Sequence, residues 1–130
     1  MPGTAASRTV LIVDDEALIR RILEDLLTAH GFTCRTASSG DEALRACADA
    51  PPDLILLDIL MPGLDGIETC RRLKATPAGA AIPVIALTAW DDATTVARMQ
   101  EAGSLRYLPK PIVPEQLVAA VKLALAPSAA

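Results

Sequence analysis

The stretch LILLD at residues 54–58 decides the fold, because four consecutive branched apolar residues end there on a carboxylate. VLIV at residues 10–13 is likewise followed by Asp14 and Asp15, and VIAL at residues 84–87 is followed by Thr88. A continuous apolar run, in place of alternating apolar and polar residues, is typical of a strand covered on both faces, as in parallel sheets. The three runs therefore predict buried parallel strands that end in polar residues.

The segments between these runs have the spacing and end signals of helices. We expect strands at 9–13, 32–37, 54–57, 83–87 and 105–108, and helices at 17–29, 41–49, 67–74, 93–102 and 114–125. Gly31 ends the first helix, Ser39 is able to cap the second, and Pro51 with Pro52 stops the second helix. Five strands that alternate with five helices predict an α/β fold with a doubly wound parallel sheet.

Composition narrows the class of protein. A chain of 130 residues with 52% hydrophobic residues is the size of one domain with a substantial core. The net charge of -4 and the lack of a long Lys/Arg run give no support to direct nucleic-acid binding. No window of eighteen apolar residues and no signal-peptide core occur, so we expect no membrane insertion and a cytoplasmic location. Three widely spaced cysteines indicate neither a disulfide framework nor a zinc site.

Polar side chains follow four of the expected strands. Asp14 and Asp15 follow the first, Asp58 the third, Thr88 the fourth, and Lys110 comes two residues after the fifth. Ligands of doubly wound sheets bind outside the carboxyl ends of the strands, where these side chains would lie. The sequence therefore predicts three carboxylates, a hydroxyl and an ammonium along one edge of the sheet.

These groups suit metal-assisted phosphoryl transfer. Mg²⁺ prefers oxygen ligands, so Asp15 and Asp58 are expected to bind it, with Asp14 acting partly through water. The charges of three carboxylates, the divalent ion and the Lys110 ammonium cancel. An ionised carboxylate is a competent nucleophile without a neighbouring base, so Asp58 can accept a phosphoryl group.

VLIVDDE, LILLDILMPGLDGIE, VIALTA and YLPKP together resemble the receiver domain of two-component response regulators, of the chemotaxis type. The resemblance covers residues 9–126, between an N-terminal tail at 1–8 and a C-terminal tail at 127–130. It implies a flavodoxin-like sheet with strand order 2-1-3-4-5. The loop after Asp58, with Met61, Pro62, Gly63 and Gly66, is similar to the loop that the family has there.

The resemblance also implies roles for the site residues. Asp58 would be phosphorylated by a histidine kinase or a histidine phosphotransfer protein. Mg²⁺ would be held by Asp14, Asp15, Asp58 and the backbone carbonyl of Leu60. Thr88 and Lys110 would contact the phosphoryl group, Thr88 with Tyr107 would form the conformational switch, and the bond between Lys110 and Pro111 would be cis.

Other side chains carry hypotheses with a simpler alternative. Leu60 and Trp90 are bulky and apolar near the site, and either shield the phosphoryl group from water or are ordinary surface residues. Leu18 either helps to dock a phosphodonor helix or widens the core contact of the first helix. Arg20 and Arg21 beside it are expected to be solvated. His30 is expected to act at the helix C-terminus, and not as a phosphodonor.

The predicted function is that of a phosphoacceptor signalling protein, which catalyses only its own phosphorylation and dephosphorylation. It would signal to a protein partner by a conformational switch, with phosphorylation-dependent dimerisation as a further option. Two alternatives stay open: a receiver domain from a larger regulator with a DNA-binding or enzymatic output, or a small metal-dependent phosphatase. A phosphatase would need a second acid or base and a substrate cavity, and the sequence indicates neither.

Overall fold

The computed structural model describes residues 8–89 and 92–126. Trp90 and the expected tails, apart from Arg8, lie outside these residues. The strands are β1 (Thr9–Val13), β2 (Thr33–Ala37), β3 (Leu54–Asp58), β4 (Val84–Thr88) and β5 (Arg106–Pro109). The helices are α1 (Ala17–Ala29), α2 (Gly40–Asp49), α3 (Gly66–Lys74), α4 (Pro77–Ala80), α5 (Ala93–Ala102) and α6 (Pro114–Leu125).

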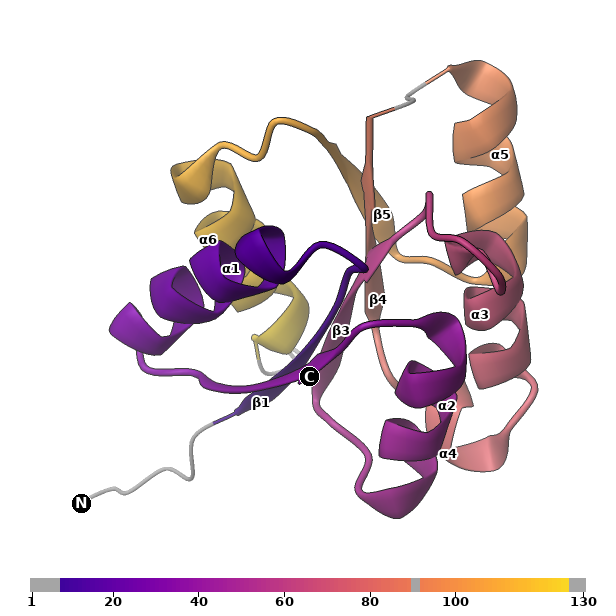
Figure 1. Ribbon diagram of the computed structural model, residues 1–130, viewed down its shortest axis with the longest axis horizontal. Coiled ribbons are helices and arrows are strands. Elements are labelled where there is room, and N and C mark those ends of the chain that lie inside the picture. The colour runs from indigo at the N-terminus through magenta and orange to yellow at the C-terminus, as the bar shows by residue number, and fades with distance from the viewer. Residues whose placement is uncertain (1–7, 90–91, 127–130) are drawn as a thin grey trace.

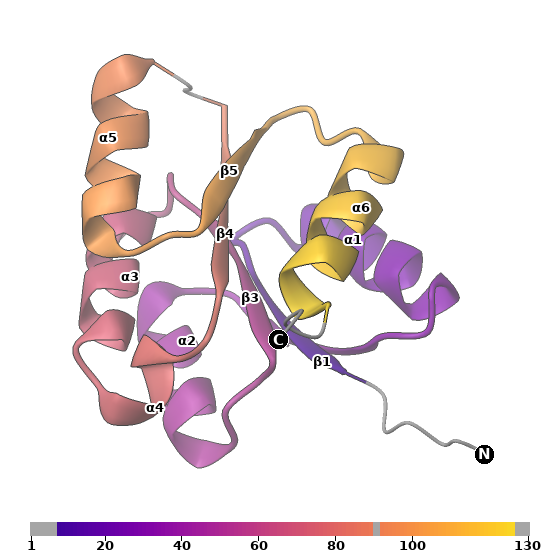
Figure 2. The ribbon, with the colours of Figure 1, turned by 180° about the vertical axis from the view of Figure 1, so that it is seen from behind.

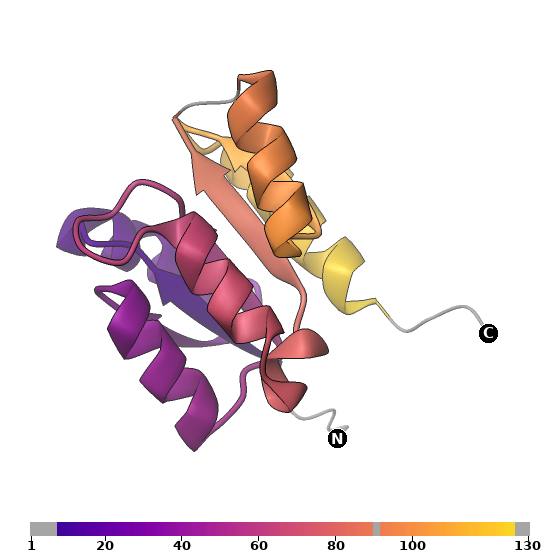
Figure 3. The ribbon, with the colours of Figure 1, turned by 90° about the vertical axis from the view of Figure 1, so that its right-hand side faces the viewer.

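The strands form one sheet in the order β2-β1-β3-β4-β5, and every neighbouring pair is parallel. The predicted fold class and strand order are confirmed. Helices α1 and α6 cover one face of the sheet, and α2, α3, α4 and α5 lie on the other (Figures 1 and 2). The side view in Figure 3 shows α2, α3 and α5 next to one another on that second face.

Both faces of the central strands are buried, which explains why their sequences lack alternation. Leu11 and Val13 belong to the core cluster under α2, α3 and α5, whereas Val10 and Ile12 belong to the cluster under α1 and α6. Side chains of a strand point alternately to its two faces, so a strand between two cores is apolar throughout. Within the described residues, no helix is long and apolar enough to cross a membrane.

Side chains at the helix ends mark several of the expected boundaries. The Ser39 hydroxyl accepts a hydrogen bond from the Glu42 amide at 3.1 Å, which confirms the predicted cap of α2. His30 follows α1, and its Nδ1 lies 3.0 Å from the carbonyl oxygen of Leu26. This contact at the end of α1 confirms the role expected for His30. Gly31 then adopts a φ of 91°, a left-handed conformation that favours glycine.

All five predicted helices are present, and the structure adds a one-turn helix, α4, that was not predicted. Its signals are local: the Thr76 hydroxyl accepts a hydrogen bond from the Gly79 amide at 2.9 Å, and Pro77 occupies the first turn. Proline suits that position because its missing amide hydrogen would have no partner there. Four residues are too few to show a helical repeat of apolar residues.

Candidate functional site

The carboxyl edge of the sheet brings the predicted residues together. Asp14 directly follows β1, Asp58 is the last residue of the adjacent β3, and Thr88 is the last residue of β4. Lys110 directly follows β5, and its backbone amide donates a 2.7 Å hydrogen bond to the carbonyl of Thr88. The order of the strands therefore places residues that are far apart in the sequence around one point.

The carboxylates differ in burial but lie close to one another. Asp14 is fully buried, Asp58 is 3% exposed, and Asp15 is exposed. One carboxylate oxygen from each of the three lies within 4.8 Å of the others. The Lys110 Nζ reaches into this cluster, 3.1 Å from Asp14 Oδ2 and 3.3 Å from Asp58 Oδ1. One ammonium thus bridges the two buried carboxylates.

Backbone amides hold both buried carboxylates in place. The amide of Glu16 donates to Asp14 Oδ1 at 2.9 Å, and the amide of Leu60 donates to Asp58 Oδ1 at 3.3 Å. The Leu60 side chain is 52% exposed, so it lies at the surface beside the site. The bonds to amides two residues further on fix the carboxylates relative to the loops that follow β1 and β3.

Burial and charge make Asp58 unusual among the acidic groups. Desolvation by burial, reinforced by the nearby charge of Asp14, raises the pKa of Asp58 from 3.8 to about 6, although Lys110 opposes the shift. Burial alone would lower the pKa of Lys110. Its hydrogen bond to Asp14 and the charges of both carboxylates outweigh burial and raise that pKa. The ammonium therefore stays charged, and an added cation would relieve the crowding of the carboxylates.

The acidic cluster has the composition of a site for a hard divalent cation. Carboxylate and carbonyl oxygens with a few waters are the usual ligands of Mg²⁺. The oxygens of Asp14, Asp15 and Asp58 converge, and the exposure of Asp15 leaves the cluster open to solvent on one side. The donor set fits Mg²⁺ in type of atom and in charge.

Arg20 belongs to the site, so the expectation that it is merely solvated is wrong. Its Nη1 donates a 2.7 Å hydrogen bond from α1 to the carbonyl oxygen of Asp14. Arg21, by contrast, is exposed and lies 3.5 Å from the exposed Asp25. The position of Arg20 in the sequence could have indicated this contact. A long side chain one turn inside α1 is able to reach back to the end of β1.

Thr88 and Tyr107, the groups expected to sense a phosphoryl group, lie on β4 and β5, whereas Asp14 follows β1 on the other side of β3. Thr88 is fully buried, and Tyr107 on β5 is half-buried and packs against the core cluster beneath α5. The peptide bond between Lys110 and Pro111 is cis, the isomer that the resemblance implies. Trp90, the other candidate for shielding, lies outside the described residues.

Gly66 allows the loop after Asp58 to fold back onto β3. A Cβ atom at Gly66 would lie 2.3 Å from the carbonyl oxygen of Asp58 and 2.6 Å from the Cα of Ile59. The Gly66 amide donates a 2.9 Å hydrogen bond to the Ile59 carbonyl. Asp65 then caps α3 by accepting a hydrogen bond from the Glu68 amide at 2.8 Å, a cap that was not predicted.

Comparison with known proteins identifies the family. Residues 10–122 match the response regulator receiver domain. The chain belongs to this family. The receiver domain is 40% identical over 113 residues to the response regulator MprA of Mycobacterium ulcerans (strain Agy99), an alignment that covers 87% of this chain and 48% of MprA. It is 42% identical to the transcriptional regulatory protein ResD of Bacillus subtilis (strain 168), with 87% and 46% of the two chains covered. The chain spans about half the length of these curated relatives.

Solved structures agree with this assignment. The chemotaxis protein CheY4 of Vibrio cholerae is 29% identical and superposes with a TM-score of 0.89, covering 92% of this chain and 100% of CheY4. The BeF3-activated N-terminal receiver domain of Klebsiella pneumoniae RstA is 29% identical with a TM-score of 0.84, covering 92% and 99%. Receiver domains act in two-component signalling with histidine kinases or phosphotransfer proteins, and phosphoaspartate and Mg²⁺ are characteristic of them.

Proposed function

We propose that this receiver domain accepts a phosphoryl group on Asp58 from a phosphohistidine of a kinase or phosphotransfer protein. The observation that carries the proposal is the position of the Asp58 carboxylate. It is almost fully buried, yet it lies within a carboxylate cluster and 3.3 Å from the Lys110 ammonium. A buried carboxylate with a raised pKa in such a cluster is typical of a functional site.

In the proposed step, a carboxylate oxygen of Asp58 forms a bond to phosphorus while the bond from phosphorus to the donor imidazole nitrogen breaks. The released imidazole takes a proton from solvent, and the product is a mixed anhydride on Asp58. Little proton transfer at the nucleophile is required, so positioning and charge stabilisation are the main tasks of the site. Lys110 lies where it can stabilise the added negative charge.

Asp14, Asp15, Asp58 and the backbone carbonyl of Leu60 are the proposed ligands of Mg²⁺. When bound, Mg²⁺ neutralises charge on the phosphoryl oxygens. The protein contributes the arrangement of the ligands: the Glu16 amide orients Asp14, the Leu60 amide orients Asp58, and Arg20 anchors the Asp14 carbonyl. These contacts fix the donors before any ion or phosphodonor arrives.

Thr88 and Tyr107 are the proposed switch. Thr88 would move toward the phosphoryl group and Tyr107 would turn into the vacated space, which shifts the population of surface shapes near α5. Support comes from their adjacent strands, because Thr88 on β4 pairs with Pro109 and Ala86 pairs with Tyr107. Leu60 and Trp90 remain the proposed shield against hydrolysis of the phosphorylated state.

We propose that the receiver domain spans residues 9–126 and passes its signal by contacting another protein. The proposed location is the cytoplasm, and no direct contact with nucleic acid is proposed. The second candidate is that the domain functions as the receiver part of a longer regulator. This candidate is favoured because the relatives are about twice as long as the matched region. A small-molecule phosphatase has no such support. The family is one of signalling proteins, so catalysis is proposed only for the chemistry of its own phosphoryl group.

Incubation with acetyl phosphate and Mg²⁺, followed by intact mass measurement, tests the assignment of Asp58. Wild type should gain the mass of one phosphoryl group, and Asp58→Asn should gain none. Asp25→Asn is the matched control, because Asp25 is an exposed carboxylate on α1 outside the cluster. Absence of label on wild type, or equal labelling of wild type and Asp58→Asn, would show that Asp58 is not the acceptor.

A further inference from the structure

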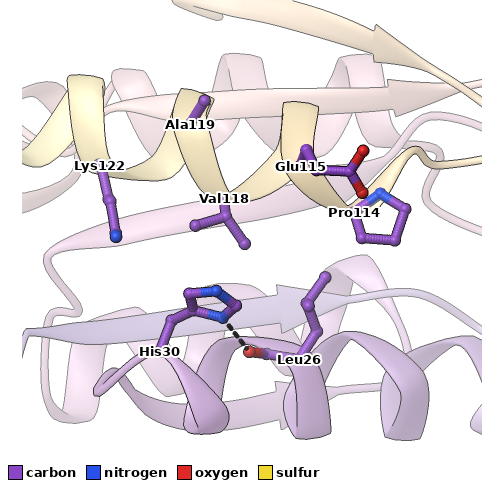
Figure 4. A pocket seen from close by; sticks show the side chains of 7 residues that line it. All are labelled: Leu26, His30, Pro114, Glu115, Val118, Ala119 and Lys122. Carbon is purple, nitrogen blue, oxygen red and sulfur yellow. Dashed lines mark hydrogen bonds between the residues drawn. The ribbon is translucent and has the colours of Figure 1, made fainter.

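The outer face of α1 and α6 carries an apolar groove that no part of the phosphorylation site uses (Figure 4). Its volume is about 530 Å³, and its walls are Leu26, His30, Pro114, Glu115, Val118, Ala119 and Lys122. His30 is held at one end by its contact with the Leu26 carbonyl. Leu123, also on α6, is 62% exposed, so apolar surface extends beyond the groove. Exposed apolar side chains beside a groove make this face a candidate for a contact with another protein.

Two opposite charges lie at the two ends of the α6 wall. Figure 4 shows Glu115 at one end of the groove and Lys122 at the other, with Val118 between them. Both charged residues are exposed, and within the described part of the chain neither forms an ion pair. They are seven residues apart, which is two helical turns or about 10.5 Å. They therefore share a side of α6 but are too distant to pair with each other.

We propose that a second copy of this chain docks on this face, with the two α6 helices antiparallel about a two-fold axis between Val118 and Ala119. In that register, Glu115 of each copy lies opposite Lys122 of the other, and Val118 lies opposite Ala119. The contact is isologous, as in most soluble dimers. Its centre consists of the exposed Ala119 and the largely buried Val118, and its rim is charged, which is the usual anatomy of an interface. The small Ala119 side chain allows the two helices to approach closely.

The charge pattern is the observation that favours a second copy of this chain as the occupant. Glu115 and Lys122 lie symmetrically about the point between residues 118 and 119. Two copies of α6 therefore bring opposite charges together only when the helices run antiparallel. Antiparallel pairing forms two ion pairs at once, and parallel pairing of α6 with α6 would place like charges together. Asp58 and Lys110 lie at the carboxyl edge of the sheet and are not among the groove residues, so the dimer does not require phosphorylation.

Sedimentation equilibrium of the unphosphorylated chain, from micromolar to millimolar concentration, tests the proposal. Wild type should show a reversible monomer–dimer equilibrium. Glu115→Lys alone and Lys122→Glu alone should each weaken dimerisation about tenfold or more, because both ion pairs become repulsive. The double variant should restore the dimer. A mixture of the two single variants should form a heterodimer, because all four charges then face opposite charges.

Two further variants separate this contact from general effects of charge and folding. Ala119→Arg places a bulky cation at the centre and should abolish the dimer, while far-ultraviolet circular dichroism shows the fold retained. Glu101→Lys reverses an exposed charge on α5, on the opposite face of the sheet, and should leave the dimer unchanged. A wild type that stays monomeric, or a dimer insensitive to the Glu115 and Lys122 reversals, would overturn the proposal. Failure of the mixed variants to associate would equally exclude the antiparallel register.

Discussion

Replacing Asp58 with asparagine should make the protein more stable at neutral and alkaline pH in the absence of Mg²⁺. Burial and the charge of Asp14 raise the pKa of Asp58 from 3.8 to about 6 in the folded protein. The folded state then binds more protons than the unfolded state between these two pH values. The free energy of unfolding of wild type therefore falls as pH rises through this window, and stays lower above it.

The size of the effect follows from the shift. A difference of about two pKa units, at 1.36 kcal/mol per unit, corresponds to about 3 kcal/mol. Asparagine resembles the protonated acid and does not titrate. The stability change caused by Asp58→Asn should therefore be more favourable by about 2 kcal/mol at pH ~8 than at pH ~4.5, because at pH ~4.5 the unfolded carboxyl is already mostly ionised and about 1 kcal/mol of the effect is present. Asp58 is only 3% exposed, so solvent screening reduces this figure little.

Urea unfolding in EDTA at the two pH values measures the effect, with fluorescence or circular dichroism as the signal. Asp25→Asn is the control, because its carboxylate is exposed and the substitution should change stability by less than about 0.5 kcal/mol at either pH. Adding Mg²⁺ at the higher pH should stabilise wild type and have a smaller effect on Asp58→Asn. An equal effect of Asp58→Asn at both pH values, or a reversed sign, would refute the argument from burial and charge.

Three other substitutions probe the surroundings of the site. Gly66→Ala should lower the free energy of unfolding by about 2 kcal/mol or more, since its Cβ would lie 2.3 Å from the Asp58 carbonyl oxygen; urea unfolding that matches wild type would contradict this close approach. Lys110→Met should raise the pKa of Asp58 further above about 6, because the ammonium now lowers it; a carboxyl ¹³C NMR titration without Mg²⁺ that shows no rise would disprove the coupling. Arg20→Met should lower stability by about 1.5 kcal/mol through loss of its bond to the Asp14 carbonyl, and a calorimetric melting curve like that of wild type would show the bond to be unimportant.

Much of the fold was predictable because its strands are buried on both faces. Runs such as residues 54–57 are typical of a strand at the centre of a layered sheet, and the Ser39 hydroxyl is typical of a helix N-cap. The strand order was not available from such runs, because an apolar run does not show which strands are neighbours. It came from the resemblance to receiver domains. Helix α4 was missed because four residues show no periodicity.

The candidate site was predictable to the extent that strand ends meet in a parallel sheet. That rule brings Asp14, Asp58 and Lys110 together, and their contacts in the structure agree with it. The contact of Arg20 with the Asp14 carbonyl was not predicted, because a charged residue on a helix is expected to face solvent. The structure shows which strand end lies within its reach. The Asp65 cap could have been found from the glutamate three residues later. Burial of each carboxylate, and so the pKa of Asp58, depends on tertiary packing that no local pattern shows.

The parity of residues along β3 and β4 places Asp58 and Thr88 on opposite faces of the sheet. Leu54 and Leu56 face the core under α1 and α6, so Asp58, two residues further along β3, shares their face. Val84 and Ala86 face the core under α5, so Thr88 shares that face with Tyr107. Insertion of one residue within β4 would reverse this parity and direct Thr88 toward α1 and α6. The number of residues in β4 thus determines which of the two cores lies beside the Thr88 side chain.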